Sequence, residues 1–170
     1  MELIKEIHDK DLGIKPMVKG DIRYRLRRAA RALVFQGNKI AVLNAKALFL
    51  HQLPGGGVEG NESIGEGLMR EVMEETGCII NQIQDLGVVI EYRNEIELIQ
   101  VSYVFTGNVQ DGSRQPVFTG EEIDEGFVLE WMTVDEAFAL MKNQDRPNTY
   151  ACRFRGARDA AILEYYLNKE

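Results

Sequence analysis

The spacing of apolar residues predicts a series of short strands in the first third of the chain. From residue 24 onward, runs rich in Val, Leu, Ile and Ala form one strand ending near Phe35, a second through "KIAVLN" and a third through "ALFLHQ". The Gly37-Asn38 pair between the first two runs is typical of a tight turn. We therefore expect a meander that leads directly into the glycine-rich segment "LPGGG".

The same kind of pattern returns in the middle of the chain. The runs "QDLGVVIEY" and "IELIQVSYVFTGNV" are rich in β-branched and aromatic residues, which predicts a hairpin that turns near Arg93 and Asn94. Residues 107–120 are expected to form a loop, and "GFVLEWMT" to form one more strand. The amino-terminal segment "MELIKEIHDKDLGIKP" has a mixed pattern that fits either a short strand or an arm.

Three segments have the period of a helix instead. Residues 64–76 follow Ser63 in a capping-box pattern, carry an apolar stripe and stop at Gly77. The run "VDEAFALMKN" predicts a second helix begun by Thr133 or Asp135, and "FRGARDAAILEYYLNKE" predicts a terminal helix. Strands that alternate with a few helices indicate the α/β class. A chain of 170 residues is expected to form a single domain over residues 1–170, with residues 1–22 as a candidate amino-terminal arm.

Composition excludes several classes of partner. The formal net charge of −7 argues against general nucleic-acid binding, because that binding depends on Lys and Arg that neutralise phosphates. No apolar run approaches the roughly 18 residues of a membrane-spanning helix, and the first 30 residues lack the apolar segment of a secretory signal. Two cysteines, Cys78 and Cys152, are too few for a disulfide framework. We expect a cytoplasmic protein with no nucleic-acid or membrane partner.

The predicted helix at residues 64–76 carries three glutamates on one side. Since successive helical residues rotate by about 100 degrees, Glu71, Glu74 and Glu75 fall within a narrow sector away from the apolar stripe. Like charges this close repel one another unless a cation lies among them. Magnesium prefers such oxygen ligands, but solvated acidic faces have the same spacing. The helix alone does not decide between a metal site and a solvated surface.

The loop that precedes this helix favours the metal site. Glycines at positions 55, 56 and 57 let the backbone turn sharply and approach a ligand without a Cβ, and Pro54 stiffens the entrance. Glycine-rich loops are weak signals on their own, because most are only turns. Here the loop leads directly into the acidic helix, so its carbonyls could complete a metal shell.

Together, the loop and the helix carry a family resemblance. Gly56, Glu62 and the run "REVMEETG" at residues 70–77 resemble, position by position, the signature box of the Nudix (MutT-like) hydrolases. Cys78 stands where the family has an aliphatic residue, and a buried thiol is also small and apolar. The match spans residues 56–78. It implies a Nudix-type α/β/α sandwich with a mixed β-sheet.

The resemblance also implies an activity and its cofactor. Nudix enzymes hydrolyse a pyrophosphate bond in a nucleoside diphosphate linked to another moiety, and they use Mg²⁺ or sometimes Mn²⁺. By position, Glu71, Glu74 and Glu75 would be the catalytic carboxylates and metal ligands, and the Gly56 carbonyl would be a further ligand. Glu71 would either bind the metal or act as the base that deprotonates water.

Two further roles follow from the same resemblance. Glu62 and Arg70 would form an ion pair that ties the loop to the helix, a role that suits the bidentate guanidinium. A fourth carboxylate often comes from outside the box in this family. Among Glu121, Glu122 and Glu125 of the segment "GEEIDEG" we choose Glu122 as this metal ligand. The alternative is that the whole segment is solvated.

Residues outside the box are candidates for contact with substrate. Arginines recur between residues 23 and 31, where they either hold phosphates or protect an exposed strand edge, and we assign Arg28 to the substrate. His51 and Tyr92 are assigned to stacking on a base. The alternatives are a partly exposed structural position for the histidine and packing within the sheet for the tyrosine.

The resemblance narrows the substrate by two absences. Coenzyme A pyrophosphatases carry an arginine just upstream of the box, and the corresponding segment "AVLNAKALFLHQ" contains none. ADP-ribose pyrophosphatases tend to have a proline a short way downstream of the box, but no proline occurs between Pro54 and Pro116. Both substrate classes are therefore disfavoured. We expect a nucleoside triphosphate or related nucleotide as substrate, with a dinucleoside polyphosphate or a nucleotide sugar as the alternative. A Nudix-fold module that senses a ligand or binds a partner without catalysis is a second alternative, although such proteins usually lose box carboxylates. The sequence itself does not define the oligomeric state, but many relatives are homodimers and the basic amino-terminal strand is a candidate homodimer interface.

Overall fold

The computed structural model describes residues 1–15 and 20–169. The strands are β1 (Leu3–His8), β2 (Arg25–Gln36), β3 (Lys39–Ala45), β4 (Leu50–Gln52), β5 (Ile79–Arg93), β6 (Leu98–Asp111) and β7 (Phe127–Met132). The helices are α1 (Ile64–Thr76), α2 (Gly120–Asp124), α3 (Val134–Asn143) and α4 (Tyr150–Lys169). Short 3-10 turns connect some of them, namely η1 (Asp9–Leu12), η2 (Lys46–Leu48) and η3 (Asn94–Ile96).

The strands form one mixed sheet. Its order is β1-β5-β6-β2-β3-β4, and β7 pairs with β3. β1 runs parallel to β5 and β2 runs parallel to β6, whereas the other neighbours are antiparallel. The long β5–β6 hairpin lies at the centre of this arrangement, as predicted from its β-branched and aromatic residues.

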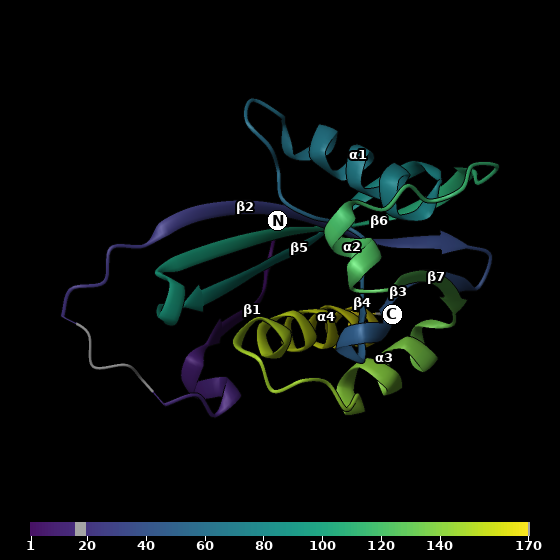
Figure 1. Ribbon diagram of the computed structural model, residues 1–170. Coiled ribbons are helices and arrows are strands. Elements are labelled where there is room, and N and C mark those ends of the chain that lie inside the picture. The colour runs from purple at the N-terminus through teal and green to yellow at the C-terminus, as the bar shows by residue number, and fades with distance from the viewer. Residues whose placement is uncertain (16–19, 170) are drawn as a thin grey trace.

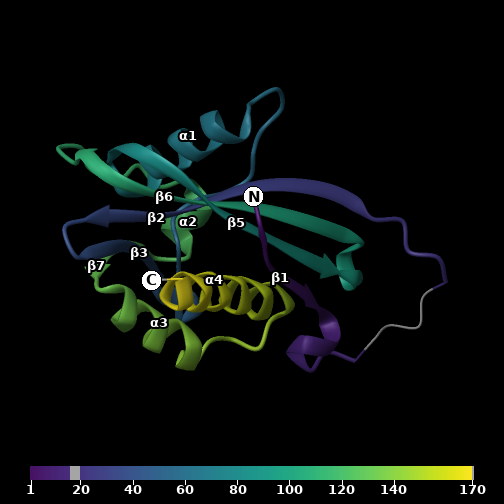
Figure 2. The ribbon, with the colours of Figure 1, turned by 180° about the vertical axis from the view of Figure 1, so that it is seen from behind.

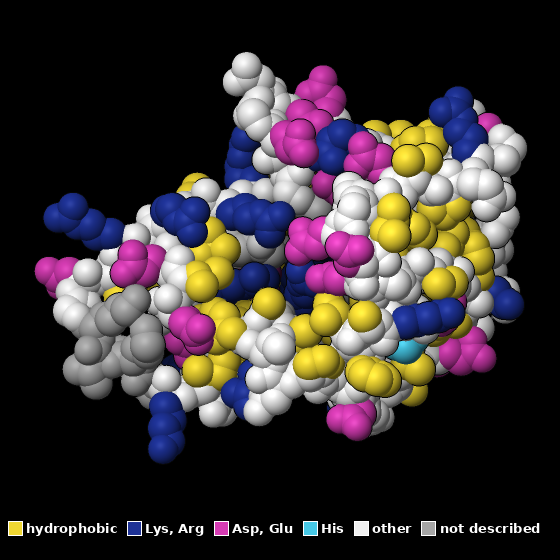
Figure 3. Space-filling view, in the orientation of Figure 1, with side chains coloured by type: hydrophobic (Ala, Val, Ile, Leu, Met, Phe, Trp, Pro, Cys, Tyr) yellow, Lys and Arg dark blue, Asp and Glu magenta, His cyan; other side chains and the backbone are white. Residues whose placement is uncertain are grey.

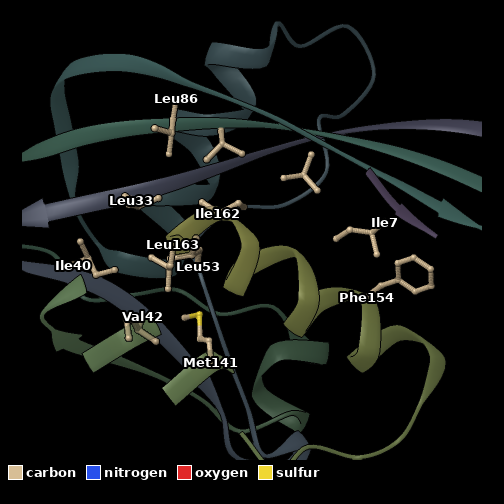
Figure 4. Close-up of a cluster of buried hydrophobic side chains, with 13 residues drawn as sticks. Ile7, Leu33, Ile40, Val42, Leu53, Leu86, Met141, Phe154, Ile162 and Leu163 are labelled. Carbon is tan, nitrogen blue, oxygen red and sulfur yellow. The ribbon is translucent and has the colours of Figure 1, made fainter. Parts of the chain in front are cut away.

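Helices cover both faces of the sheet, as Figures 1 and 2 show. α1 packs on one face, where its Leu68 and Val72 contact Ala32 and Val34 of β2 in a shared core. α3 and α4 pack on the other face. The larger core on that side is shown in Figure 4 and includes Ile7, Leu33, Ile40, Val42, Leu53, Leu86, Met141, Phe154, Ile162 and Leu163. The predicted α/β/α sandwich with a mixed β-sheet is confirmed.

Residues of β2 alternate between these two cores. Leu33 faces α4, and Ala32 and Val34 face α1. Because successive side chains of a strand point to opposite faces, Arg27 and Arg31 share the α4 side with Leu33. Arg28 lies on the opposite side. The strand alternation therefore determines which arginines of β2 point to the α4 side of the sheet.

The edge of β2 that faces β3 is only partly paired with that strand. β3 pairs with β2 at Phe35 and Gln36 alone, and the chain at residues 54–58 fills the rest of the edge. Ala32 N–H donates to the Pro54 carbonyl at 3.0 Å, and Ala30 N–H donates to the Gly56 carbonyl at 3.0 Å. The glycine-rich loop is thus held against a strand, although it is not itself a strand.

Several boundaries differ from those expected from the sequence. The third predicted strand is reduced to β4, because Lys46–Leu48 form a 3-10 turn that ends at Phe49 in a left-handed conformation with φ of 45°. β6 continues to Asp111, into the segment expected to be a loop, and that segment ends with α2. The terminal helix begins at Tyr150 rather than Phe154.

The ends of the predicted helices and the amino-terminal segment are also defined. Ser63 caps α1 in a capping box, as predicted, and α1 stops at Gly77. Thr133, one of the two candidates, is the N-cap of α3. Of the two possibilities for the amino-terminal segment, the structure has a strand, β1, although Pro16 at its end lies outside the described residues.

The state of the two cysteines agrees with the expectation that the chain has no disulfide framework. Cys78 and Cys152 are buried free thiols. Across residues 1–15 and 20–169, we find no helix with the length and apolar character needed to cross a membrane.

The packing of α3 predicts unequal effects of two adjacent substitutions. Met141 is fully buried against the sheet, whereas Leu140 is 37% exposed. We expect Met141→Ala to lower the free energy of unfolding by about 2 to 5 kcal/mol, because it leaves a cavity in the core. Leu140→Ala should change it by no more than about 0.5 kcal/mol. Urea unfolding followed by circular dichroism measures both values, and equal losses would contradict this packing of α3.

Candidate active site

A cavity of about 510 Å³ opens where the glycine loop, α1, α2 and α4 meet. Its lining has two chemically different walls. The acidic wall includes Glu59, Glu71, Glu75, Glu121, Glu122 and Glu125, and the basic wall, which we call the arginine wall, consists of Arg27, Arg31, Arg93, Arg155 and Arg158. Figure 3 shows acidic and basic side chains meeting around a hollow near the centre of this face.

Arg70 connects the glycine loop to α1. Its guanidinium pairs with both carboxylate oxygens of Glu62, at 2.8 Å from Nε and 3.1 Å from Nη2, and Nη2 also donates to the Gly57 carbonyl at 3.0 Å. Hydrogen bonds from Arg70 lower the pKa of Glu62 to about 2, so this carboxylate is charged at neutral pH. The pair predicted from the sequence is therefore present, and it fixes the loop relative to the helix.

The same guanidinium contacts two of the three glutamates on α1. Arg70 Nη1 lies 2.9 Å from Glu71 Oε1 and 3.3 Å from Glu74 Oε2. Glu71 is the less exposed of the two, with 13% of its side chain accessible against 42% for Glu74. Burial raises the pKa of the Glu71 carboxyl, and Arg70 partly offsets this rise.

Glu75, the third glutamate, is almost completely buried. It is 3% exposed, and its Oε2 accepts a hydrogen bond from the Gly55 N–H. Among the described residues, no cationic side chain lies within ion-pair distance of it. Burial raises the pKa of Glu75 to about 8, because the charged form loses its contact with water. A cation bound beside this carboxylate would favour its charged form.

The close approach of loop and helix explains two of the glycines. A Cβ on Gly56 would lie 2.3 Å from Glu71 Oε1. Gly55 has φ of 131°, and a Cβ there would lie 2.1 Å from the Ala30 carbonyl oxygen. A side chain at position 55 would therefore disrupt the backbone contact with β2, and one at position 56 would displace a carboxylate.

The donors on the acidic wall fit a hard divalent cation. Glu71 and Glu75 of the wall offer carboxylate oxygens, and Glu74, which lies outside the cavity lining, offers another. The Gly56 carbonyl, which accepts from Ala30 N–H, retains a second lone pair. The side chains do not converge as they stand: within the described part of the chain, no three His, Cys, Asp or Glu residues are grouped as metal ligands. Arg70 holds Glu71 and Glu74, and the Gly55 N–H holds Glu75.

The short helix α2 brings further carboxylates to the cavity. Glu122 lines it, but its Oε2 accepts the Thr119 N–H at 2.6 Å and caps α2. Glu125 pairs with Arg155 at 3.3 Å. The segment is thus ordered as a helix rather than a solvated loop, and the role of Glu122 as a metal ligand stays a prediction.

Paired charges form much of the arginine wall. Arg158 binds Asp159 through two hydrogen bonds of 2.6 and 3.0 Å, and Asp159 also accepts the Leu53 N–H. Burial disfavours the Arg158 cation, but the nearby carboxylates of Asp159 and Glu91 outweigh it and raise its pKa. This pair anchors the chain just before the glycine loop to α4.

A second polar chain connects β5, β6 and β2 beneath the sheet. Arg93 Nη2 donates to Glu91 at 2.7 Å, and Gln100 Nε2 donates to the other oxygen of Glu91 at 2.6 Å. Arg27 Nη1 then donates to Gln100 Oε1 at 2.8 Å. Arg27 is therefore oriented by an amide rather than by a carboxylate.

Arg31 differs from the other four arginines of the wall. It is 7% exposed, yet it has no hydrogen bond or ion pair with any residue that the structure describes. Burial, together with repulsion from Arg158, lowers the pKa of Arg31 to about 10, so the side chain remains charged at neutral pH. A buried cation without a partner is costly.

Three residues assigned to the substrate lie outside the lining of this cavity, and their contact with substrate stays a prediction. Arg28 is exposed on the α1 side of β2, His51 lies 3.6 Å from Glu130 in a separate groove, and Tyr92 stacks on His8 with a centroid distance of 4.4 Å. None of the three is among the described residues that line the cavity. The strand alternation explains the position of Arg28, since Arg27 and Arg31 have the opposite parity and lie on the α4 side of the sheet.

Sequence reasoning missed the polar chain on β5 and β6. Glu91 and Arg93 alternate along β5, and Gln100 and Ser102 alternate along β6. All four are buried. Polar residues at every second position of otherwise apolar strands were the available signal, because such positions point to one face of the sheet.

Comparison with known proteins places the chain in a family. Residues 25–152 match the model of the NUDIX domain, and the chain belongs to this family. It is a pyrophosphohydrolase, an enzyme that cleaves a pyrophosphate bond. No curated protein matches the chain.

Solved structures share the fold. A NUDIX hydrolase from Nitrosomonas europaea superposes with a TM-score of 0.62 at 21% identity, covering 85% of this chain and 90% of that one. A MutT NUDIX hydrolase from Burkholderia pseudomallei gives 0.57 at 21% identity, with 83% and 98% covered. A MutT protein from Bacillus halodurans gives 0.53 at 25% identity, with 67% and 72% covered.

The contact between Gly56 and Glu71 predicts a loss of activity without loss of fold. In Gly56→Ala the added methyl group displaces the Glu71 carboxylate, and we expect pyrophosphohydrolase activity to fall by roughly 10- to 100-fold. Gly65→Ala is the matched control, since nothing lies within 4 Å of a Cβ at that position of α1. Steady-state rates and melting temperatures of both variants test this. Full activity of Gly56→Ala would contradict the close approach of loop and helix.

Proposed function

We propose that this enzyme hydrolyses a pyrophosphate bond in a nucleoside diphosphate derivative, and that its substrate is a nucleoside triphosphate or a related nucleotide. The observation that carries the proposal is the cavity in which the glutamates of α1 face the arginine wall. Arginine binds phosphate oxygens through a rigid fork of donors. A phosphate chain lying across the cavity meets charge-neutralising groups on the basic side and metal-ligand oxygens on the acidic side.

We propose Mg²⁺, with Mn²⁺ as a substitute, as the cation of the acidic wall. Glu71, Glu74, Glu75 and the Gly56 carbonyl would hold it, and Glu122 is the proposed carboxylate from outside the box. When bound, such a cation neutralises phosphate oxygens and lowers the pKa of bound water. The burial of Glu75 supports this assignment, because a carboxylate that is 3% exposed has little other source of stabilisation.

The side chains of the box have separate tasks in this proposal. Arg70 orients the glutamates by bonding to Glu62 on one side and to Glu71 and Glu74 on the other. Burial raises the pKa of Glu71, which makes its carboxylate a better proton acceptor for attacking water than a solvated glutamate. Glu71 is therefore the base or a ligand, and the other two glutamates are ligands.

Replacement of one carboxylate tests the proposed chemistry. We expect Glu74→Gln to lower activity by about 100-fold or more, because an amide loses the charge that holds the cation. The measurement is a screen of nucleoside triphosphates, dinucleotides and nucleotide sugars with Mg²⁺, with phosphate release and chromatography of products. Glu164→Gln, an exposed position of α4, is the control and should match the wild type. Absence of turnover for every substrate, or turnover that Glu74→Gln leaves unchanged, would refute the proposal.

Removal of divalent cations provides an independent test. We expect EDTA to abolish activity and excess Mg²⁺ to restore it. The melting temperature should change little, because the buried cores on both faces of the sheet are formed by apolar side chains that do not depend on a metal. Activity that survives in EDTA would contradict the proposed cofactor, and unfolding in EDTA would indicate a structural metal instead.

A further inference from the structure

Arg31 is the most unusual charged group outside the acidic wall. Its side chain lines the cavity but is 7% exposed, and its Nε has no hydrogen-bond partner among the described residues. Buried charges are normally paired, since an unpaired one loses its hydration without compensation. Such a group persists in a stable fold when a ligand completes its environment.

The neighbours of Arg31 do not supply the missing partner. Arg155 and Arg158 already pair with Glu125 and Asp159. Arg93 pairs with Glu91 through Nη2, and its own Nε is buried without a partner. These three cations are thus largely compensated by carboxylates.

Two positive charges of the arginine wall remain without a carboxylate. Arg31 has no partner among residues 1–15 and 20–169, and Arg27 donates only to the neutral amide of Gln100. Burial, together with repulsion from neighbouring arginines, lowers the pKa of Arg27 and of Arg31, and nearby carboxylates only partly offset this fall. An excess of two positive charges matches a phosphomonoester dianion, whose oxygens accept several hydrogen bonds at once.

The cavity is poorly suited to other parts of a nucleotide. Phe127 is the one aromatic residue among the described residues of its lining, and it is only 9% exposed. A base would find little aromatic surface to stack on. A neutral sugar would leave the two cations uncompensated. The phosphate end of a nucleotide therefore fits the arginine wall better than the nucleoside end does.

We propose that Arg27 and Arg31 bind a free terminal phosphate of the substrate, so that the enzyme selects nucleotides whose phosphate chain ends in a phosphate group that carries no further substituent. Nucleotides with a sugar or a second nucleoside on that phosphate are then poor substrates. This selectivity rests on the proposed function, in which the acidic wall holds the pyrophosphate bond that is cleaved. The arginine wall then holds the free end of the phosphate chain. The binding of phosphate itself can be tested without turnover.

The first experiment measures binding of inorganic phosphate by isothermal titration calorimetry, in EDTA and at a pH where phosphate is a dianion. We expect the wild type to bind and Arg31→Met to bind at least about ten-fold more weakly, since hydrogen bonds to a charged group are lost. Arg25→Met is the matched control, because Arg25 is an exposed arginine of the same strand, and its affinity should stay within about two-fold of the wild type. Absence of binding by the wild type, or equal binding by Arg31→Met, would overturn the proposal.

Stability measurements separate binding from a structural role. Arg31→Met should melt at the same temperature as the wild type or higher, because its side chain has no hydrogen bond or ion pair with a described residue and the substitution removes a buried charge. A large drop in melting temperature would instead assign Arg31 to the fold. Arg27→Met, at a less buried position, gives a second variant that should also weaken phosphate binding.

The second experiment measures selectivity. The best nucleoside triphosphate of the substrate screen is compared with its γ-phosphate methyl ester, which removes one charge and caps the terminal phosphate. We expect the wild type to favour the free triphosphate by about ten-fold or more in kcat/KM, and Arg31→Met to lose most of this preference. Equal rates on both compounds in the wild type would refute the selectivity while leaving the pyrophosphohydrolase function intact. Phosphate binding through Arg31 without turnover of any nucleotide would refute the proposed function but would support the phosphate site at Arg27 and Arg31.

Discussion

The backbone contact between the glycine loop and the open edge of β2 is the constraint on which the site depends. β3 leaves β2 after two residue pairs, so the N–H and C=O groups along the remaining edge need other partners. The loop provides them through the carbonyls of Pro54 and Gly56, which accept from N–H groups of β2, and through the Val58 N–H, which donates to the Arg28 carbonyl. The approach is so close that a Cβ at Gly55 would lie 2.1 Å from the Ala30 carbonyl oxygen. Because the loop leads into α1, this contact also fixes where the glutamates of the helix lie relative to the sheet.

The same arrangement brings opposite charges from both faces of the sheet to one place. Glu71 and Glu75 come from α1 on one face, whereas Arg31 of β2 and Arg158 of α4 lie toward the other face. They meet in one cavity because the loop, which has little side-chain bulk, replaces a full neighbouring strand at this edge. Most of the buried charges are paired, as in Arg158 with Asp159 and Arg93 with Glu91. Neither Arg31 nor Glu75 has an ion-pair partner among the described residues, but burial raises the pKa of Glu75 to about 8, whereas Arg31 remains charged at neutral pH. An unpaired buried cation reduces stability unless a ligand completes its environment.

The sequence predicted the parts of the site that are local along the chain. Gly56, Glu62, Arg70 and the three glutamates lie within 20 residues of one another, so helical spacing and loop chemistry were enough to group them. The arginine wall could not be grouped in this way, because Arg27, Arg93 and Arg158 come from distant segments that only the sheet pairing and α4 bring together. The face of the sheet on which each arginine of β2 lies could not be predicted either. Leu33 and Val34 are both apolar, so the composition of β2 does not reveal which parity faces α4.

The local field, rather than the net charge, decides which ligands this protein attracts. The chain carries a formal net charge of −7, which by itself disfavours a polyanionic nucleotide. In the cavity, however, five arginines are concentrated on one wall, and two of them lack a carboxylate partner among the described residues. Electrostatic interactions strengthen where water is excluded, so the buried Arg31 acts more strongly on a ligand than an exposed charge does, whereas Arg27 is exposed. The acidic wall has the reverse property, since it repels phosphate until a cation is present. In the proposed mode of binding, a phosphate chain is therefore held in one orientation, with its end at the arginines, because the two walls of the cavity neutralise negative charge by different means.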